Sequence, residues 1–396
     1  VVRYFYARNS YALTLTKGTG VASMTASGDG VSTDGTKAQY GATVKLNGTL
    51  SAGYKDLKFA ATKTGDAATA VTLDAQNRIT MPAYAVTVTG SATADQVNYS
   101  IQLFYMGTDG KYSTTPSSTV VREKAATTDT TVSVTAETSG LSKTGFTYDS
   151  ENTSNVTSQT IKGDGSTVFK LYYSRNKYTL TIKPNGGTYG GKTADTTVTQ
   201  YFETTYSVGA VTRSGYTFGG WTLSGGYGSF ASSTFTFGAG NSTLTAGWTA
   251  NTVKVTLNLN YSDTTKSTPN FSGTNGTVYI TYNTKNIYAA RTGTAYPYAG
   301  SGDTITPKAT RNGYTFNGWY SAATDGTQII NANGVLTANW TTNAADGQTL
   351  YAHWTVSTYT ITYVNNGGTL ASGATTSYTI ESTASLPSIT KVGYSF

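Results

Sequence analysis

The side chains that carry most enzyme and metal chemistry are scarce in this chain, which has one histidine and no cysteine among its 396 residues. The absence of cysteine excludes a disulfide framework, a thiolate metal site and a cysteine nucleophile. A Ser-His-Asp site or an imidazole-bound metal would have to be built on His353 alone. His353 alternates with Ala352 and Trp354, so it is predicted to be an outward-facing strand residue without a chemical role.

The acidic residues and glycine pairs do not form catalytic patterns either. The nearest acidic clusters, Asp66 with Asp74 and Asp149 with Glu151, lack the spacing of a calcium loop or a glycosidase pair. Two Gly-Asp-Gly triplets, at 28–30 and 163–165, are typical of turns in a β protein, because no helical pattern follows them as a phosphate loop requires. We therefore expect no enzyme activity, no cofactor and no metal site.

The composition indicates a folded β protein with an uncharged polar surface. Charged residues make up 12% of the chain, about half the usual share of roughly 25%. The chain contains 31 tyrosines and 44 glycines but only 7 prolines, which is typical of strands separated by turns. The net charge of +7 comes from singly scattered lysines and arginines, so a solvated surface is favoured over a nucleic-acid site. No apolar stretch approaches the ~20 residues of a membrane span, so no membrane insertion is expected.

Exposed tyrosines are the remaining candidates for ligand chemistry. Tyr4, Tyr6, Tyr172 and Tyr173 could form a platform on which sugar rings stack, since amphipathic rings suit polyol faces. The other interpretation is that alternate rings fill the core while the rest cover the sheet.

Three recurring patterns define the elements that position these side chains. A Gly-aromatic strand opener, preceded two residues earlier by Arg213, Arg311 or Lys391, occurs at 215–221 (GYTFGGW), 313–319 (GYTFNGW) and 393–396 (GYSF). A closing strand occurs at 244–248, 336–340 and 350–354, and an opening strand before an Asn-Gly-Gly turn occurs at 178–182 and 359–363. Large residues recur at every second position, so each strand is predicted to bury one face.

Each module is therefore predicted to close its core with aromatic and aliphatic residues from three strands. The glycines after each Gly-aromatic opener are expected to allow a bulge that redirects the following tryptophan. The predicted core residues are Tyr178, Tyr216, Phe218, Trp221, Trp248, Tyr314, Phe316, Trp319, Trp354 and Tyr359, with Trp340 expected on a duplicated closing strand.

These patterns carry a resemblance to a known repeat. Residues 177–396 resemble the Listeria–Bacteroides repeat, also called the internalin-B B-repeat, with 349–354 (TLYAHW) and 318–320 (GWY) near the consensus. Residues 11–94 resemble a divergent relative without tryptophan, and residues 95–176 resemble the mucin-binding-protein-like repeats of Gram-positive surface proteins. The resemblance implies a mostly β chain: a tandem array of small β-grasp-like modules that forms an elongated rod.

The predicted organisation has six parts. They are the last strand of a preceding module (1–10), a divergent B-repeat-like module (11–94), a mucin-binding-protein-like module (95–176), a B-repeat module (177–250), a B-repeat module with an insertion (251–355) and a truncated B-repeat module (356–396). The module at 251–355 lacks the Asn-Gly-Gly turn and carries an insertion through about residue 299, so an extra hairpin or an elaborated edge is expected there. Because residues 2–9 resemble 169–176 and neither end can close its own core, we expect the native protein to continue in both directions.

The resemblance implies an extracellular repeat protein at the cell surface or attached to the cell wall. Its expected role is that of an adhesin stalk or spacer, with host or neighbouring-cell glycans, mucins or surface proteins as partners. The alternative is a structural subunit of an extracellular filament or sheath that self-associates by pairing of edge strands.

Overall fold

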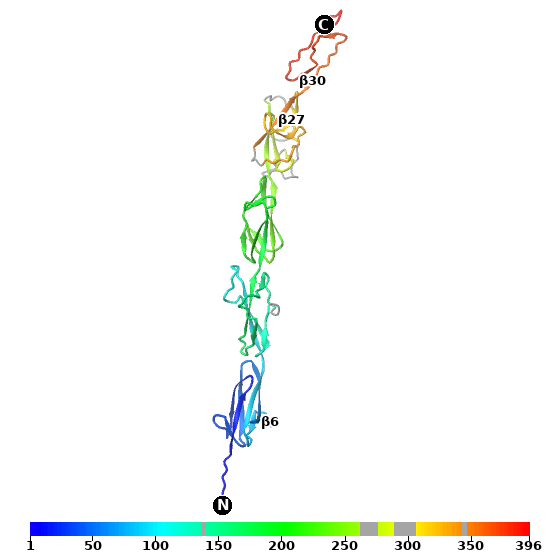
Figure 1. Cartoon of the computed structure of the whole chain (residues 1–396). Helices are drawn as coiled ribbons and strands as arrows, with labels where there is room; N and C mark the ends of the chain where they lie inside the picture. The colour runs from blue at the N-terminus through cyan, green and yellow to red at the C-terminus, as the bar shows by residue number, and fades with distance from the viewer. Residues whose placement is uncertain (136–139, 262–275, 289–305, 343–346) are drawn as a thin grey trace. The chain divides into compact units, whose positions relative to one another are not determined.

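A computed structural model describes residues 1–135, 140–261, 276–288, 306–342 and 347–396, and all regular elements in these residues are β-strands (Figure 1). This confirms the predicted mostly β repeat fold. None of the described residues forms a helix long and apolar enough to cross a membrane. The chain divides into two compact units, which are described one at a time. The first comprises residues 1–179, 199–206 and 227–241, and the second comprises 180–198, 207–226 and 242–396.

The first unit opens with a five-stranded sheet and a three-stranded sheet that share one core. The five-stranded sheet has the order β3-β1-β8-β5-β6, with β1 (Ser10–Lys17), β3 (Lys37–Gln39), β5 (Tyr54–Lys63), β6 (Asp66–Val71) and β8 (Val86–Ala94). The smaller sheet has the order β2-β4-β7, with β2 (Val21–Ser27), β4 (Thr43–Leu50) and β7 (Arg78–Thr80). Aliphatic residues dominate the core between them, among them Leu13, Val44 and Met81. Residues 1–9 form no strand, and their side chains are exposed.

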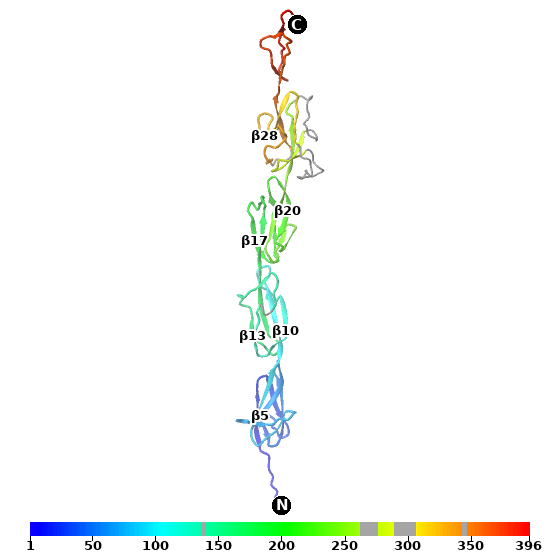
Figure 2. The same cartoon turned by 90° about the vertical axis from the view of Figure 1, so that its right-hand side faces the viewer.

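The same unit continues with a four-stranded sheet of order β10-β9-β14-β12; its edge strand β10 is labelled in Figure 2. Its strands are β9 (Gln96–Tyr105), β10 (Ser118–Thr127), β12 (Phe146–Tyr148) and β14 (Val168–Arg175), and β11 (Thr131–Ser133) pairs with β13 (Ser158–Thr160). A further three-stranded sheet has the order β18-β22-β21, with β18 (Thr205–Ser207), β21 (Ser229–Ala231) and β22 (Thr234–Thr236).

Two larger sheets follow along the chain. One has the order β17-β15-β23-β20, with β15 (Lys177–Lys183), β17 (Thr196–Tyr201), β20 (Tyr216–Ser224) and β23 (Ser242–Ala250). The other has the order β26-β25-β24-β29-β27-β28, with β24 (Thr252–Asn258), β25 (Thr277–Thr281), β26 (Ile287–Tyr288), β27 (Tyr314–Tyr320), β28 (Gln328–Asn331) and β29 (Gln348–Val356). Small two-stranded sheets pair β16 (Thr188–Tyr189) with β19 (Val211–Thr212), β30 (Thr358–Thr360) with β32 (Ser377–Thr379), and β31 (Thr369–Leu370) with β33 (Ile389–Thr390).

One feature is common to all four larger mixed sheets: the first and last strands of a repeat are parallel neighbours. The pairs are β1 with β8, β9 with β14, β15 with β23, and β24 with β29. Parallel strands need a long crossover connection, and here strands and loops of the repeat provide it. The pair therefore joins the two ends of each repeat at the middle of its sheet.

The predicted bulge lies on the Gly-aromatic strand and is confirmed in both modules that contain Gly-Trp. The register of β20 against β23 shifts between Phe218 and Gly220, and β27 against β29 shifts between Phe316 and Gly318. The glycine directly before each tryptophan has a positive φ, 112° at Gly220 and 118° at Gly318, which a side chain would strain. After the shift, the tryptophan stands opposite a small alanine of the closing strand.

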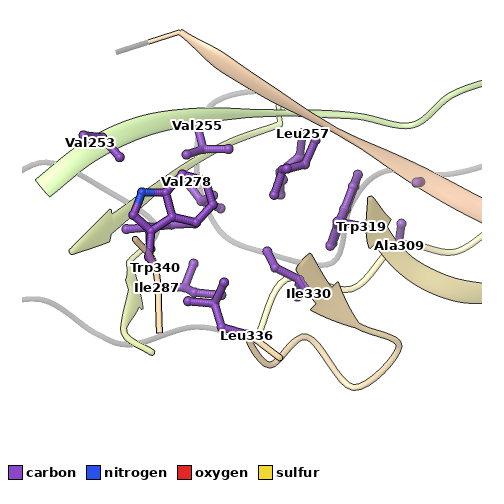
Figure 3. Close-up of a cluster of buried hydrophobic side chains, with 13 residues drawn as sticks. Val253, Val255, Leu257, Val278, Ile287, Ala309, Trp319, Ile330, Leu336 and Trp340 are labelled. Atoms are coloured by element: carbon purple, nitrogen blue, oxygen red, sulfur yellow. The ribbon is translucent and has the colours of Figure 1, made fainter. Parts of the chain in front are cut away.

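The predicted duplicate closing strand at 336–340 is wrong. An isolated bridge joins Leu336 to Ile330, and the strand beside β24 is β29. Leu336 and Trp340 are nevertheless buried in the core, with Trp340 near Val253 and Trp319 at the other end of the cluster beside Ala309 (Figure 3). The Leu-x-Ala-x-Trp pattern fits any segment that buries its large residues, so it does not distinguish a strand from an irregular core segment.

At one edge of this sheet, β25 pairs with β24 as β17 pairs with β15, and β26 adds a short strand beside β25. Residues 262–275 and 289–305 of the predicted insertion lie outside the described residues.

Candidate functional site

The described residues contain no group of three or more His, Cys, Asp or Glu side chains that could hold a metal ion. The ring of His353 stacks on Tyr320, with centroids 3.9 Å apart and planes 9° from parallel. Its Nε2 lies 2.9 Å from the carbonyl oxygen of Ala322. These contacts hold the imidazole against its own sheet.

The perturbed tyrosines also argue against a built base. Burial raises the pKa of Tyr112, and its hydrogen bond to Asp149 raises the pKa further. The pKa of Tyr105 and that of Tyr148 are raised as well, chiefly by burial. A tyrosine acting as a base or nucleophile needs its pKa lowered toward neutrality, whereas the pKa of each of these three tyrosines is raised.

The aromatic residues that the sequence singles out do converge, on β20 and β23 of the second unit. The ring of Phe218 contacts Trp221 and Trp248 edge-on, with centroids 5.5 and 5.6 Å apart, and Tyr189 meets Trp221 at 6.2 Å. The indole Nε1 of Trp248 donates to the carbonyl of Pro184 at 2.9 Å. The cluster therefore ties the closing strand to the turn after the opening strand.

The same arrangement recurs on β27 and β29. Phe316 contacts Trp319 at 5.4 Å and Trp354 at 5.3 Å, and the Nε1 of Trp354 donates to the carbonyl of Leu259 at 2.8 Å. Trp319 donates its own Nε1 to the carbonyl of Pro307 at 2.9 Å. Both clusters satisfy the indole N–H groups named here while burying aromatic area, which stabilises a small core.

The basic residue before each opener has a definite position. The guanidinium of Arg213 lies 3.9 Å from the ring centre of Tyr216, and that of Arg311 lies 3.6 Å from the ring centre of Tyr314. Lys391 lies over Tyr394 at 4.6 Å in the same way. This cation–π contact orients the first aromatic side chain of the opener.

The ten predicted core residues fall into three groups. Trp319 is fully buried. Half-buried are Tyr178, Tyr216, Trp221, Trp248, Tyr314, Phe316 and Trp354. Phe218 and Tyr359 are exposed, at 39% and 41%, so assigning them to a core is wrong. Phe218 precedes the bulge and covers the tryptophans from outside, whereas Tyr359 lies on a two-stranded sheet that pairs it with Tyr378.

A residue that the sequence patterns missed is Asn260. The predicted Asn-Gly-Gly turn places Asn185 at a φ of 51°, and its Nδ2 donates to the carbonyl of Ala246 at 2.9 Å. Asn260 has a φ of 56° and donates to the equivalent carbonyl of Ala352 at 3.1 Å. The turn thus keeps its asparagine without the two glycines, and the signal available was an Asn shortly after the opening strand.

The proposed tyrosine platform is not assembled on the residues that could have formed it. Tyr173 is buried, and Tyr172 stacks on Phe104 with centroids 4.5 Å apart and planes 7° from parallel. Tyr4 and Tyr6 are exposed. The core-and-cover interpretation therefore holds for Tyr172 and Tyr173.

Comparison with known proteins identifies the repeat in three stretches of the chain. The model of the Listeria-Bacteroides repeat domain matches residues 178–247, 279–353 and 359–396. These stretches are similar to Listeria-Bacteroides repeats. The match indicates an extracellular surface repeat protein, and repeats of this kind occur in surface proteins. It does not extend to residues 1–177, where the mucin-binding-protein-like assignment stays a prediction.

Two other comparisons add little. A search of curated proteins finds no match. Among solved structures, the chain is similar to the Bacillus anthracis TIE protein at 10% identity and a TM-score of 0.26. The alignment covers 61% of this chain and 51% of that one, so the chain spans about half the length of that protein.

Proposed function

We propose that this chain is a non-enzymatic spacer of an adhesin-type surface protein, which carries a binding region away from the cell and contributes glycan-, mucin- or protein-binding surface of its own. The observation that carries the proposal is the serial architecture. Four successive repeats each join their own first and last strands at the sheet centre, and only one residue lies between the last strand of one repeat and the first strand of the next. Each added repeat lengthens such a chain, and only one connecting residue is needed per repeat.

The spacer role predicts that adhesion depends on the number of repeats rather than on any one repeat. Cells displaying the native protein would be compared with cells displaying a variant from which residues 251–355 are removed. We expect surface exposure to persist, adhesion to mucin-coated surfaces to fall because the reach is shorter, and adhesion to be restored when residues 177–250 are duplicated in its place. Adhesion that depends on residues 251–355 specifically would instead place the binding site in that repeat.

The second candidate function, an extracellular filament, is favoured by exposed apolar side chains on edge strands. Val121 on the edge strand β10 is 54% exposed. However, β10 carries Arg122, Glu123 and Lys124 next to it, and its pairing with β9 is irregular between Arg122 and Ala126. Charges and bulges at an edge oppose the addition of another strand. Light scattering of the purified chain separates the two candidates, since a spacer stays monomeric and a filament subunit forms long polymers.

A further inference from the structure

The four connections between successive repeats are built to one plan. A single connector residue separates the strands: Asp95 between β8 and β9, Asn176 between β14 and β15, Asn251 between β23 and β24, and Ser357 between β29 and β30. Two of these connections lie in the first unit and two in the second.

The connector residue is bound to the repeat before it through its backbone. Its N–H donates to the carbonyl of an opening glycine, namely Gly53, Gly145, Gly215 or Gly313, at 2.8 to 2.9 Å in all four connections. These glycines have φ values between 77° and 81°. The left-handed conformation turns their carbonyls toward the connector, and a side chain there would be strained.

The side chain of the connector is bound as well, by the residue two positions after the glycine. Lys55 donates to Asp95 at 2.7 Å, Thr147 to Asn176 at 2.8 Å and Thr217 to Asn251 at 2.6 Å, while the hydroxyls of Thr315 and Ser357 lie 3.2 Å apart. The chemistry of the pair varies, but a polar bond is made at the same place.

The connector is also bound to the repeat after it. Its carbonyl accepts from the N–H of a residue in a receiving turn: Thr128 at 3.0 Å, Phe202 at 2.8 Å and Tyr282 at 2.8 Å in the first three connections. The next residue of each turn has a positive φ, 61° at Asp129, 64° at Glu203 and 56° at Asn283. That residue donates its N–H to the carbonyl of a buried core residue, namely Ile161, Phe237 or Trp340, so the turn is fixed from inside its own repeat.

The opening glycine lies directly against the next repeat. A Cβ added at Gly53, Gly145, Gly215 or Gly313 would come within 3.0 Å of Thr128, Phe202, Tyr282 or Ile380, respectively. At such distances the neighbour must shift, so each glycine is required by close approach as well as by its φ. By contrast, Gly65 in the first repeat has a φ of 80° and open space in front of it.

The aromatic residue after each glycine meets a chemically matched side chain of the next repeat. The hydroxyls of Tyr54 and Tyr314 donate to Asp129 and Glu381. The hydroxyl of Tyr216 accepts from Asn283 at 3.4 Å while its ring contacts Tyr282 edge-on. The remaining pairing lacks a hydroxyl and is apolar: Phe146 meets Phe202 with ring centroids 6.1 Å apart.

That apolar pairing is supported by Arg175, which bonds Glu203 at 2.6 Å and lies 4.7 Å from the ring centre of Phe146. Tyrosine therefore faces a polar partner, and phenylalanine faces a ring.

From this recurrence we propose that the Gly-aromatic pair and connector of one repeat form a clamp on the receiving turn of the next, which fixes the angle between neighbouring repeats. The inference goes beyond the spacer role and does not depend on it, because a chain with another role would still have rigid connections.

The test uses spin labels on the full chain, which contains no natural cysteine to interfere. Lys45→Cys and Glu123→Cys place two exposed labels on either side of the first connection. Electron–electron resonance then measures the distribution of distances between them. The clamp predicts a narrow distribution, which Gly53→Ala broadens at least twofold. Gly65→Ala, which introduces the same backbone strain without a contact, should leave it narrow.

Tyr54→Phe provides a second variant in case Gly53→Ala disturbs the repeat itself. It removes only the hydroxyl that bonds Asp129, and it should broaden the distribution by a smaller amount. A parent distribution as broad as that of Gly53→Ala would overturn the clamp, and so would equal broadening by Gly65→Ala. Neither result would affect the spacer proposal, because a flexible chain could also act as a spacer. Conversely, failure of the adhesion experiment would not alter the distance distribution that the clamp predicts.

Discussion

Replacing Trp319 by alanine should destabilise its repeat more than any other single truncation of an aromatic opener residue. The side chain is fully buried, contacts Phe316 at 5.4 Å and donates its Nε1 to Pro307 at 2.9 Å. Truncating a large buried aromatic residue costs about 3–5 kcal/mol, and an unpaired buried carbonyl adds to the upper end of that range. Because a typical domain is stable by about 5–15 kcal/mol, the loss approaches the whole stability of a small repeat.

Hydrogen exchange followed by mass spectrometry measures this loss repeat by repeat, which a single melting curve of a multidomain chain does not. A change of about 3–5 kcal/mol corresponds to a decrease of about 10²- to 10⁴-fold in protection, since each 1.4 kcal/mol is tenfold. We expect the decrease in peptides from β27 and β29 and none in peptides from β9. The protection measured for Trp319→Phe should fall between that of Trp319→Ala and that of the parent chain. Unchanged protection in β27 would refute the assignment of this tryptophan to the core.

Other changes should separate packing from surface roles. Asn260→Ala should lower the free energy of protection against hydrogen exchange in β29 by about 1–3 kcal/mol, because the carbonyl of Ala352 loses a hydrogen-bond donor. If hydrogen exchange shows unchanged protection in β29, the role assigned to Asn260 in the turn is wrong. Phe218→Ser should lower the stability of its repeat much less than Trp319→Ala lowers that of its own, since the ring of Phe218 is 39% exposed. Equal losses of protection against hydrogen exchange in the two variants would contradict the exposed position of Phe218. The repeat at 11–94 should also lose stability in acid. Hydrogen bonds lower the pKa of Asp34 to about 2, chiefly through the hydroxyl of Ser32, and they lower the pKa of Asp66 as well. A carboxyl group whose pKa is lowered in the folded state stabilises that state at pH values above its ordinary pKa of 3.8. This contribution to the free energy of unfolding is lost as the pH falls from about 4 toward 2. Circular dichroism melts across this range should show the decrease, and Asp34→Asn should make it shallower; a parent whose melting is flat from pH 4 to pH 2 would contradict it.

Local backbone chemistry was predictable from the sequence where one residue type is uniquely suited to a conformation. The bulge after Phe218 and Phe316 follows from the glycine directly before each tryptophan, because only glycine adopts φ values near 112° and 118° without strain. Periodicity likewise located the opening and closing strands that make the parallel pairs, since alternation reports which face is buried.

The identity of a buried segment was less predictable, because different backbones can bury the same residues. The pattern at 336–340 matches the closing strand at 350–354, yet Trp340 takes the place that Phe237 has in the first unit. Each exchanges backbone hydrogen bonds with a receiving turn, Trp340 with Asn283 and Thr284, and Phe237 with Glu203 and Thr204. Only the pairing of distant strands decides between the two interpretations, and sequence spacing does not report it.

The Gly-aromatic opener both contacts the next repeat and packs within its own repeat. A comparison of the four repeats distinguishes these two roles. In β20 and β27 the first aromatic residue meets the next repeat, and the later phenylalanine and tryptophan contact each other within their own repeat. The repeats at 11–94 and 95–176 contain no tryptophan and fill their cores with other residues, but they keep the glycine and the aromatic residue at 53–54 and 145–146. Many side-chain combinations can fill a core of given volume, whereas a positive φ and a contact closer than 3.0 Å admit only glycine. The connection is therefore more tightly specified in this chain than the cores that it joins.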